Sequence, residues 1–409
     1  MMDERHNPEF IAKIAGRILS DHFGEEICLC PEKIFSTWGS IVVRCRVIGQ
    51  PSAIPHTLIV KKAREDRVKY DPDSSSVPNA AHAIFNDWAA IRFLNQISSD
   101  PPLSPSSYGG SREFGLIVLE DLGDGDAPNT ADALHGREPA LAEALLVDHA
   151  SLIGRLHAAT IGRAAEYRRI RGELGPWPQP KKLYQDPWSD ARREPIEESE
   201  IEEAIRIYRN GFETIGINPR SGVEDEIALV TAEVERDPGP FLAFCKGDQD
   251  GAGDYIRCGA QPRLFDFGVG GYRHALIEGM PGRMTWGSAM CIPRRILPLM
   301  QRGYQLQLGQ GCWEAIDQAL FHRELVKAGA RWNIFHLVHR LPEALERDRQ
   351  RGPTTLRQQI MAWIEAFADL SEEYGQLPAL GHSAREMRAR LCELWPAETH
   401  SLPFYPAFQ

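Results

Sequence analysis

Residues 245–271 read CKGDQDGAGDYIRCGAQPRLFDFGVGG and contain two short strand-like segments flanked by aspartates. The segments are residues 255–257 and 263–265, and the residues between them favour a turn. Asp248 lies in the loop before the first segment, and Asp266 directly follows the second. Strand propensity and turn residues therefore predict a hairpin that brings Asp248 and Asp266 to the same end.

Two carboxylates at one end of a hairpin repel each other, so a cation is expected between them. Mg²⁺ that carries a nucleotide would fit, because Mg²⁺ binds one or two carboxylates together with substrate phosphates. From this stretch alone, two solvated loop aspartates are an equally good interpretation. The remainder of the chain decides between the two.

The length and composition of the chain are those of a globular protein with more than one lobe. It has 409 residues, of which 43% are hydrophobic and 25% charged, and its formal net charge is −11. Such an acidic chain argues against nucleic-acid binding. No stretch approaches the ~18 uninterrupted apolar residues of a membrane helix, and the first ten residues lack the apolar core of a secretion signal. We therefore expect a cytoplasmic protein with no nucleic-acid or membrane partner; its oligomeric state is not predicted.

The N-terminal part of the chain predicts one helix followed by strands. Apolar residues at helical spacing predict a helix over residues 8–23, and Gly24 is its expected stop. Three strand-like segments follow, at residues 26–29, 41–48 and 57–60.

Two features of these strands suit phosphate binding, although each has a commoner interpretation. Gly39 and Ser40 end a small-residue turn that would close over phosphates, and a plain hairpin turn is the alternative. Lys61 ends an apolar strand and would reach phosphates, and a solvated strand end is the alternative. Its neighbour Lys62 is expected to point to the opposite face of the strand.

A helix with an acidic residue comes next, followed by a strand that ends in an acidic loop. Residues 82–97 predict a helix that includes Asp87, which either pairs with Lys61 or is a surface acid. A strand over residues 114–119 then runs into Glu120, Asp121, Leu122 and Gly123. This arrangement is typical of a hinge between two lobes, where backbone groups bond a flat heterocycle.

After the hinge the chain is predicted to be mostly helical. Residues 140–160 form a long amphipathic helix, on which His157 is expected to be a packed, hydrogen-bonded core residue. The glutamate-rich residues 194–203 open another helix, and a solvated N-terminus is favoured there over a cation-binding rim. His336 and His339 lack a third ligand nearby, so no metal site is predicted at them.

Short motifs carry a resemblance to a known family. They are 58-LIVK-61, 85-FNDW-88 with 91-IRFL-94, 119-LEDLG-123, 153-IGRLH-157, 246-KGD-248 and 265-FDFG-268. Each is weak alone. In this order and spacing, over roughly residues 25–275, they resemble the aminoglycoside phosphotransferase and choline kinase-like family, which has the protein kinase fold.

The resemblance implies a role for each matching residue. Asp248 matches the catalytic aspartate, which orients or deprotonates the acceptor hydroxyl, and Asp266 matches the metal-binding aspartate. Lys61 matches the strand lysine that holds the nucleotide phosphates, and Asp87 matches its helical acid partner. Residues 120–123 match the hinge that bonds adenine. These groups suit phosphoryl transfer, which depends mainly on positioning and on neutralising charge.

The sequence departs from the family's pattern at several positions. Lys246 stands where the family usually has histidine, and Asp87 where it usually has glutamate, which has a longer arm. The family's asparagine, five residues after the catalytic aspartate, is absent, and Gly253 occupies that position. We interpret Asp254 as a replacement metal ligand in a loop that is one residue longer. The alternative is that this ligand is lost and catalysis is impaired.

The sequence therefore predicts an α+β protein with a two-lobed, protein kinase-like fold. Residues 1–120 would form a nucleotide-binding lobe with a small antiparallel sheet. Residues 121–409 would form a helical lobe with the catalytic and metal-binding loops and the substrate pocket. The predicted function is Mg²⁺-dependent transfer of the γ-phosphate of ATP to a hydroxyl of a small molecule, such as an aminoglycoside, macrolide or amino alcohol. A catalytically weakened, kinase-like binding protein is the alternative.

Overall fold

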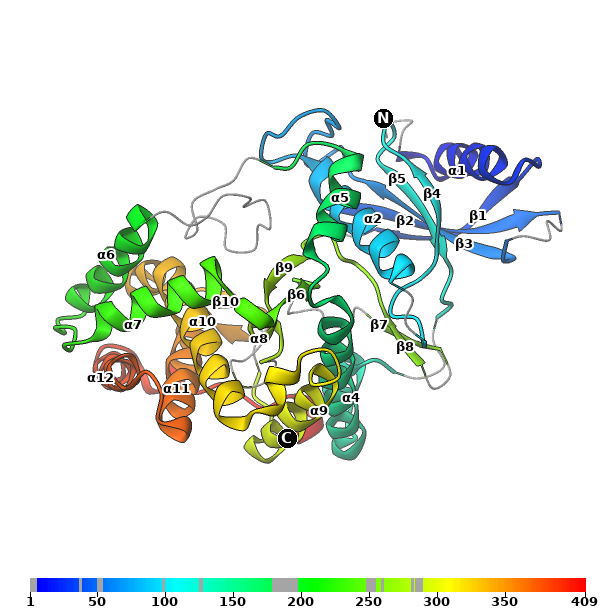
Figure 1. Ribbon diagram of the computed structural model, residues 1–409. Helices are drawn as coiled ribbons and strands as arrows, with labels where there is room; N and C mark the ends of the chain where they lie inside the picture. The colour runs from blue at the N-terminus through cyan, green and yellow to red at the C-terminus, as the bar shows by residue number, and fades with distance from the viewer. Residues whose placement is uncertain are drawn as a thin grey trace. The chain divides into compact units, whose positions relative to one another are not determined.

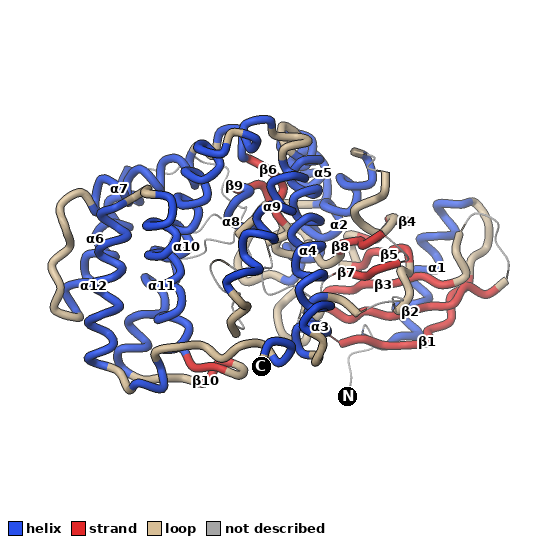
Figure 2. Tube along the Cα trace, turned by 90° about the horizontal axis from the view of Figure 1, so that it is seen from below, coloured by secondary structure: helices blue, strands red, loops and turns tan. Residues whose placement is uncertain are grey.

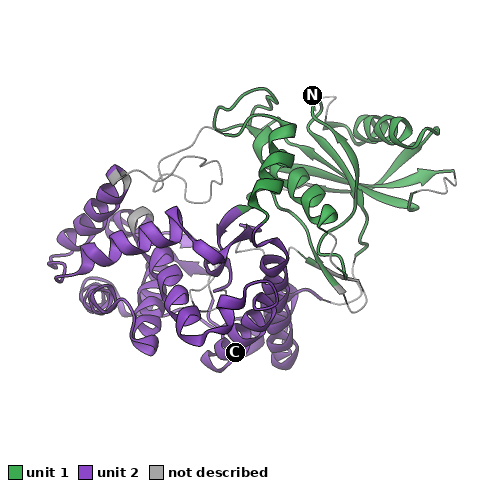
Figure 3. Cartoon of the chain, in the orientation of Figure 1, with its two compact units in different colours: residues 1–127, 163–180, 254–271 green, residues 128–162, 181–253, 272–409 purple. Residues whose placement is uncertain are grey.

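The computed structural model describes residues 6–36, 39–49, 54–97, 100–124, 128–178, 198–247, 255–258, 261–280, 283 and 290–409. The chain divides into two compact units, each assembled from separate stretches of sequence (Figure 3). Unit 1 comprises Met1–Ala127, Arg163–Pro180 and Asp254–Gly271; unit 2 comprises Pro128–Gly162, Lys181–Gly253 and Tyr272–Gln409. An N-terminal antiparallel sheet followed by a mostly helical remainder confirms the predicted α+β class. The lobe boundary at residue 120 stays a prediction.

Unit 1 is organised around a five-stranded antiparallel sheet with the strand order β1-β2-β3-β5-β4 (Figure 1). Its strands are Cys28–Ser36 (β1), Ser40–Ile48 (β2), Thr57–Ala63 (β3), Ser107–Ser111 (β4) and Leu116–Glu120 (β5). Valine and isoleucine favour strands, and buried residues alternate with more exposed ones along β2 and β3. The sheet therefore has one well-buried face and one more open face.

Helix α1 (Pro8–Phe23) covers the buried face of this sheet. Its apolar residues recur at helical spacing, and Ile11 and Leu19 share a core cluster with Val60 of β3. Gly24 ends the helix in the left-handed conformation, which glycine adopts without a steric penalty. The bounds of α1 and its stop are those predicted from the sequence.

The two faces of the sheet place Lys61 and Lys62 on opposite sides. Lys62 lies on the α1 face, where it is fully buried and its ammonium is 2.7 Å from a Glu65 carboxylate oxygen. Lys61 lies on the open face, directly across from Val42 and Ile117 in the register of the sheet. This alternation confirms the predicted orientation of the two lysines.

Two helices and a hairpin complete unit 1 beside the open face. Helix α2 (Ala80–Gln96) carries Asp87, which Lys61 reaches. Helix α5 (Ala164–Leu174) packs along α2, although it is far from α2 in the sequence. Strands β7 (Tyr255–Cys258) and β8 (Gln261–Leu264) form the predicted antiparallel hairpin, which runs directly into Asp266.

Unit 2 is mostly helical, as the tube coloured by secondary structure makes clear (Figure 2). Its helices are α3 (Thr130–His135), α4 (Pro139–Thr160), α6 (Glu198–Thr214), α7 (Val223–Val230), α8 (Ala275–Glu278), α9 (Leu297–Leu308), α10 (Gln318–Glu346), α11 (Leu356–Tyr374) and α12 (Pro378–Leu394). Helix α4 packs against α9, and α11 packs against both α10 and α12. Across the described parts of the chain, no helix is both long and apolar enough to cross a membrane.

Two pairs of short strands accompany the helices of unit 2. Strand β6 (Leu242–Cys245) pairs with β9 (Gly271–His274), and β10 (Gln350–Arg351) pairs with β11 (Thr354–Thr355). The sequence predicts a strand at β6 but does not predict its pairing with β9. Because β6 leads directly into Lys246, this pairing fixes the chain just before the predicted catalytic loop.

Candidate functional site

Lys61 lies between two carboxylates, and all three side chains belong to unit 1. Its Nζ is 2.6 Å from Asp87 Oδ2 and 2.7 Å from Asp266 Oδ1. Burial by itself would lower the pKa of the Lys61 ammonium, but the charges and hydrogen bonds of Asp87 and Asp266 outweigh it and raise that pKa above its ordinary value. The two carboxylates therefore favour the charged form of Lys61 near the end of β3, and the structure brings together three of the predicted site residues.

Asp87 connects this lysine to the segment that follows Asp266. Its side chain is 2% exposed. Its Oδ1 accepts the backbone N–H of Phe267 at 2.8 Å, while Oδ2 binds Lys61. The aspartate arm is thus long enough to make both contacts. Hydrogen bonds to charged groups contribute roughly 1.5–3 kcal/mol each, so one buried carboxylate fixes both the strand lysine and the backbone beside Asp266.

Asp266 holds a half-exposed carboxylate on a strained backbone. Its φ is 61°, in the left-handed region, which costs a non-glycine residue about 1–2 kcal/mol although aspartate tolerates it better than most. The next residue, Phe267, is fully buried and bonded to Asp87, and this contact holds the conformation. The Asp266 side chain is 48% exposed. A solvent-accessible carboxylate is the kind of donor that Mg²⁺ prefers, with phosphate oxygens completing its shell.

The side chains of the predicted hinge hold the end of β5 in place. Glu120 Oε2 accepts a hydrogen bond from Arg263 Nη1 at 2.6 Å. Asp121 Oδ2 is 2.8 Å from Arg44 Nε, and this pair is largely buried. The carboxylates of both residues are thus paired with arginines, and these ion pairs hold the loop in place. Binding of a heterocycle by residues 120–122, including Leu122, therefore stays a prediction that rests on backbone groups.

Gly39 and Ser40 lie at the start of β2, on the same side of the sheet as Lys61. Ser40 is buried and pairs with Ala63 in the register. A Cβ atom added at Gly39 would meet nothing within 4 Å, so packing does not demand glycine there. Residues 37–38 of the turn lie outside the described residues, and closure of this turn over phosphates stays a prediction.

Asp248 and Asp254 lie outside the described residues, but the backbone that leads into Asp248 is described. The N–H groups of Lys246 and Gly247 donate to the carboxylate of Glu278, at 2.8 and 2.9 Å. Glu278, in α8, is 5% exposed. A buried carboxylate of unit 2 therefore holds the chain immediately before the predicted catalytic aspartate. Sequence reasoning missed Glu278, because only the pairing of β6 with β9 brings α8 to this loop.

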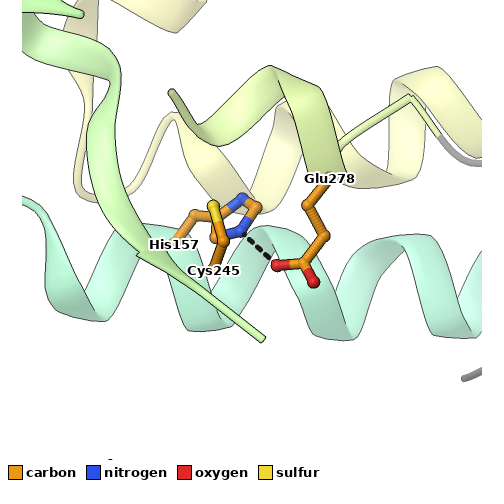
Figure 4. Close-up of side chains that lie close together, drawn as sticks. All are labelled: His157, Cys245 and Glu278. Atoms are coloured by element: carbon orange, nitrogen blue, oxygen red, sulfur yellow. Dashed lines mark hydrogen bonds and ion pairs between the residues drawn. The ribbon is translucent and has the colours of Figure 1, made fainter. Parts of the chain in front are cut away.

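Glu278 belongs to a buried polar cluster with His157 and Cys245 (Figure 4). His157 Nε2 is 3.0 Å from Glu278 Oε2, and His157 Nδ1 is 2.7 Å from the Tyr304 hydroxyl. Burial would raise the pKa of Glu278, but His157 and the two loop N–H groups outweigh it and lower that pKa below its ordinary value. The prediction that His157 is a hydrogen-bonded core residue is confirmed.

Among the described residues, these three side chains lie close enough together to be considered as ligands of one metal ion. One ligand atom from each of His157, Cys245 and Glu278 lies within 4.8 Å of the others, and the donor set is one that zinc accepts. However, hydrogen bonds already occupy both nitrogens of His157 and both oxygens of Glu278. The geometry is that of a hydrogen-bonded anchor rather than of an open metal site.

Unit 2 also contains a cavity of about 290 Å³, between the start of α9, the length of α11 and the C-terminal segment. Glu365, Asp369 and Glu373 repeat every four residues along α11 and line one wall. Arg294 Nη2 is 2.6 Å from Asp369, and Arg283 Nη1 is 2.7 Å from Glu373. The cavity therefore offers both acidic and basic groups, and its volume is near the lower end of the range for small-molecule sites.

Solved structures of small-molecule kinases align with this chain over most of its length. A streptomycin–ATP complex of APH(2″)-IIa is 12% identical, with 80% of this chain and 92% of that chain covered and a TM-score of 0.42. A choline/ethanolamine kinase family protein from Mesorhizobium loti is 12% identical, with coverage of 92% and 99% and a TM-score of 0.40. A choline kinase from Cryptosporidium parvum is 11% identical, with coverage of 95% and 97% and a TM-score of 0.41.

These structures are of the two kinds of kinase that the sequence motifs resemble. At the level of sequence, no family model matches the chain, and no curated protein matches it either.

Proposed function

We propose that this protein is an ATP- and Mg²⁺-dependent phosphotransferase that acts on a hydroxyl of a small molecule, with the fold of the aminoglycoside phosphotransferase and choline kinase-like family. The observation that carries the proposal is the placement of Lys61 between Asp87 and Asp266. A strand lysine, a helical acid and a half-exposed carboxylate on a glycine-containing loop are the parts that hold a metal-bound triphosphate.

Each residue has a distinct task in the proposed reaction. Lys61 binds oxygens of the nucleotide phosphates, and Asp87 keeps its ammonium in place. Asp266, with Asp254 as the proposed second ligand, would hold Mg²⁺, which would supply the positive charge that neutralises the phosphates. Asp248 orients the acceptor hydroxyl and accepts its proton, as the hydroxyl oxygen bonds to the γ-phosphorus and the bond from that phosphorus to the bridging oxygen of ATP breaks to release ADP. Residues 120–122 bond the adenine, and Gly39 and Ser40 close over the phosphates.

The cavity lined by α11 is the proposed place for the acceptor. Arg283 lies five residues after Glu278, whose carboxylate holds Lys246 and Gly247. This closeness in the sequence supports placing the acceptor near the predicted catalytic loop of unit 2. Carboxylates and guanidinium groups side by side suit an acceptor that carries several hydroxyls and a charged group.

The proposal is tested by incubating the full-length protein with Mg-ATP and a panel of amino sugars, macrolides and amino alcohols. We expect one acceptor class to raise ADP release, and the Asp248→Asn variant to lose that increase while still binding Mg-ATP. Calorimetry without acceptor gives the binding measurement. Binding of Mg-ATP without turnover of any acceptor would favour the weakened, kinase-like binding protein, and absence of Mg-ATP binding would refute both.

Lys61→Ala and Lys62→Ala should differ in their effect on nucleotide binding. Lys61→Ala removes the cation that faces the phosphates, so Mg-ATP affinity should fall by about tenfold or more. Lys62→Ala removes a fully buried partner of Glu65, so it should lower the melting temperature and leave the affinity of the folded protein unchanged. Calorimetry and thermal melting on both variants check this. A larger loss of affinity in Lys62→Ala would mean that the assignment of the two lysines is wrong.

A further inference from the structure

Arg171 of α5 is fully buried against α2, and its guanidinium is held from several directions. Its Nε donates to Asn86 Oδ1 at 2.7 Å, and its Nη1 donates to the Gly175 carbonyl at 3.2 Å. The same group lies over the rings of Phe85 and Trp177, 5.4 and 4.9 Å from their centroids. Arginine suits this position because its planar group can bond in its plane and stack on aromatic faces at once.

Asn86 connects Arg171 to the segment that follows Asp266. Its Oδ1 accepts from Arg171, and its Nδ2 donates to the carbonyl of Gly268 at 3.2 Å. The neighbouring residue, Asp87, accepts the N–H of Phe267. Two consecutive residues of α2 therefore hold the two backbone positions that directly follow Asp266.

The end of α5 is packed too closely to shift without breaking contacts. A Cβ atom added at Gly175 would lie 2.8 Å from the Phe85 ring and 2.9 Å from the Pro72 carbonyl oxygen, and its φ of 154° is one that other residues rarely adopt. The absence of a side chain lets the chain approach α2 and present its carbonyl to Arg171. The position of Arg171 is therefore fixed from both sides.

We infer that Arg171 and Asn86 are positioning residues for the metal ligand Asp266. They act through a path that runs from α5 through Asn86 to the Gly268 carbonyl, independently of the Lys61–Asp87 pair. Asp266 has a left-handed backbone, and the hydrogen bonds on the residues after it keep that conformation populated. The inference rests on the proposed function for the role of Asp266, but the contacts that carry it lie wholly within unit 1.

The Asn86→Asp variant removes the hydrogen bond to Gly268 while it keeps the one to Arg171. The aspartate keeps an acceptor for Arg171 and loses the donor to Gly268, whose carbonyl it now repels. Its added negative charge would by itself strengthen binding of a cation nearby. A weaker apparent affinity for Mg²⁺ would therefore report lost positioning rather than changed electrostatics. We expect a drop of about tenfold, which corresponds to losing one hydrogen bond to a charged or strained site.

Arg171→Lys is the second variant, and Arg92→Ala is the matched control. Arg92 also joins α2 to α5, through a surface ion pair with Glu173 at 3.0 Å, but it makes no contact with Asn86 among the hydrogen bonds of the described residues. In a magnesium titration of Mg-ATP binding, Asn86→Asp and Arg171→Lys should weaken the apparent Mg²⁺ affinity, and Arg92→Ala should match the parent.

Amide hydrogen exchange at residues 266–270, measured without nucleotide, completes the experiment. It should become faster in Asn86→Asp and Arg171→Lys and stay unchanged in Arg92→Ala. If all three variants behave alike, or if Asn86→Asp exchanges and binds like the parent, the inference is overturned. If the parent binds no Mg-ATP, the proposed function fails, while the exchange data still show whether Arg171 and Asn86 position this segment.

Discussion

Asp266→Ala should abolish Mg²⁺-dependent nucleotide binding, and Asp248→Ala should leave most of it intact. Asp266 offers a half-exposed carboxylate beside Lys61, and its loss removes the proposed metal ligand. Asp248 is assigned to the acceptor hydroxyl, so its loss should affect turnover instead. General acid–base catalysis contributes about 10²–10⁴-fold to a rate, so turnover should fall by about that factor.

Calorimetry of Mg-ATP binding to the two variants, with the magnesium-free nucleotide as the reference, measures the difference. Asp266→Ala should still fold, because Lys61 retains its contact with the buried Asp87 at 2.6 Å. A melting curve of each variant serves as the control. Equal loss of binding in both variants would show that Asp248 is a metal ligand too, and the division of tasks between the two aspartates would be wrong.

Glu278→Gln should both destabilise the protein and slow its turnover. The glutamine keeps the size of the side chain. However, its amide nitrogen is a donor and could not accept a hydrogen bond from the loop N–H group that it faces. Leaving a buried polar group without its hydrogen-bond partner costs about 1–3 kcal/mol. Because Lys246 and Gly247 lose an acceptor just before Asp248, the loop should also lose its fixed position.

Glu226→Gln is the matched control for this effect. Glu226 is also a carboxylate of unit 2 that accepts two consecutive backbone N–H groups, those of Ala379 and Leu380 at 3.1 and 2.7 Å, and it lies on α7, which packs against α6 and α12. Both variants should lower the melting temperature, and Glu278→Gln alone should lower kcat at temperatures where both remain folded. A normal kcat in Glu278→Gln would mean that the anchor serves stability alone.

The contribution of Glu278 to stability should also depend on pH. The folded pKa of Glu278 lies below its ordinary value of 4.5, so the folded state favours the ionised form. Its stabilising contribution is therefore present above pH 4.5 and is lost as the pH falls below that value towards the folded pKa. Thermal melting between pH 7 and pH 3 should show a shallower acid loss in Glu278→Gln than in the parent. An unchanged slope would contradict the pairing with His157.

The sequence predicted the elements that have strong local signals. Helix α1 begins and ends where its apolar spacing and Gly24 indicate, and α2 differs from its predicted range by two residues at most. Strand β4 was missed, since Ser107–Ser111 reads SYGGS, which is typical of a turn. A Cβ atom at Gly110 would lie 2.6 Å from the Leu116 carbonyl oxygen and 2.8 Å from the Trp88 ring. That close approach to β5 and α2 explains the glycine, and it exists only in the folded unit.

Some residues of the site could likewise be predicted from local sequence patterns, and others depend on contacts between segments that are distant in the sequence. Alternation along β3 is enough to separate Lys61 from Lys62, and the motif order is enough to select Asp87 as the partner of Lys61. The contact of Lys61 with Asp266 was not predicted. The complete burial of Lys62 depends on α1 and Glu65, which strand propensity does not describe. Glu278 and Arg171 likewise act on loops that are distant in sequence, so no local pattern marks them.

Unit 1 is made of three separate stretches, and this has a consequence for how the protein is made. During synthesis the sheet and α2 emerge first, but α5 follows only after α4, and the hairpin with Asp266 only by residue 271. Lys61 and Asp87 lack Asp266 until the hairpin has emerged, and the α2 face that receives Arg171 stays uncovered by α5 until residue 174 has emerged. A nascent chain released before residue 174 would thus expose apolar surface that chaperones recognise. For the same reason, we expect that a fragment ending at residue 127 does not fold as an independent unit.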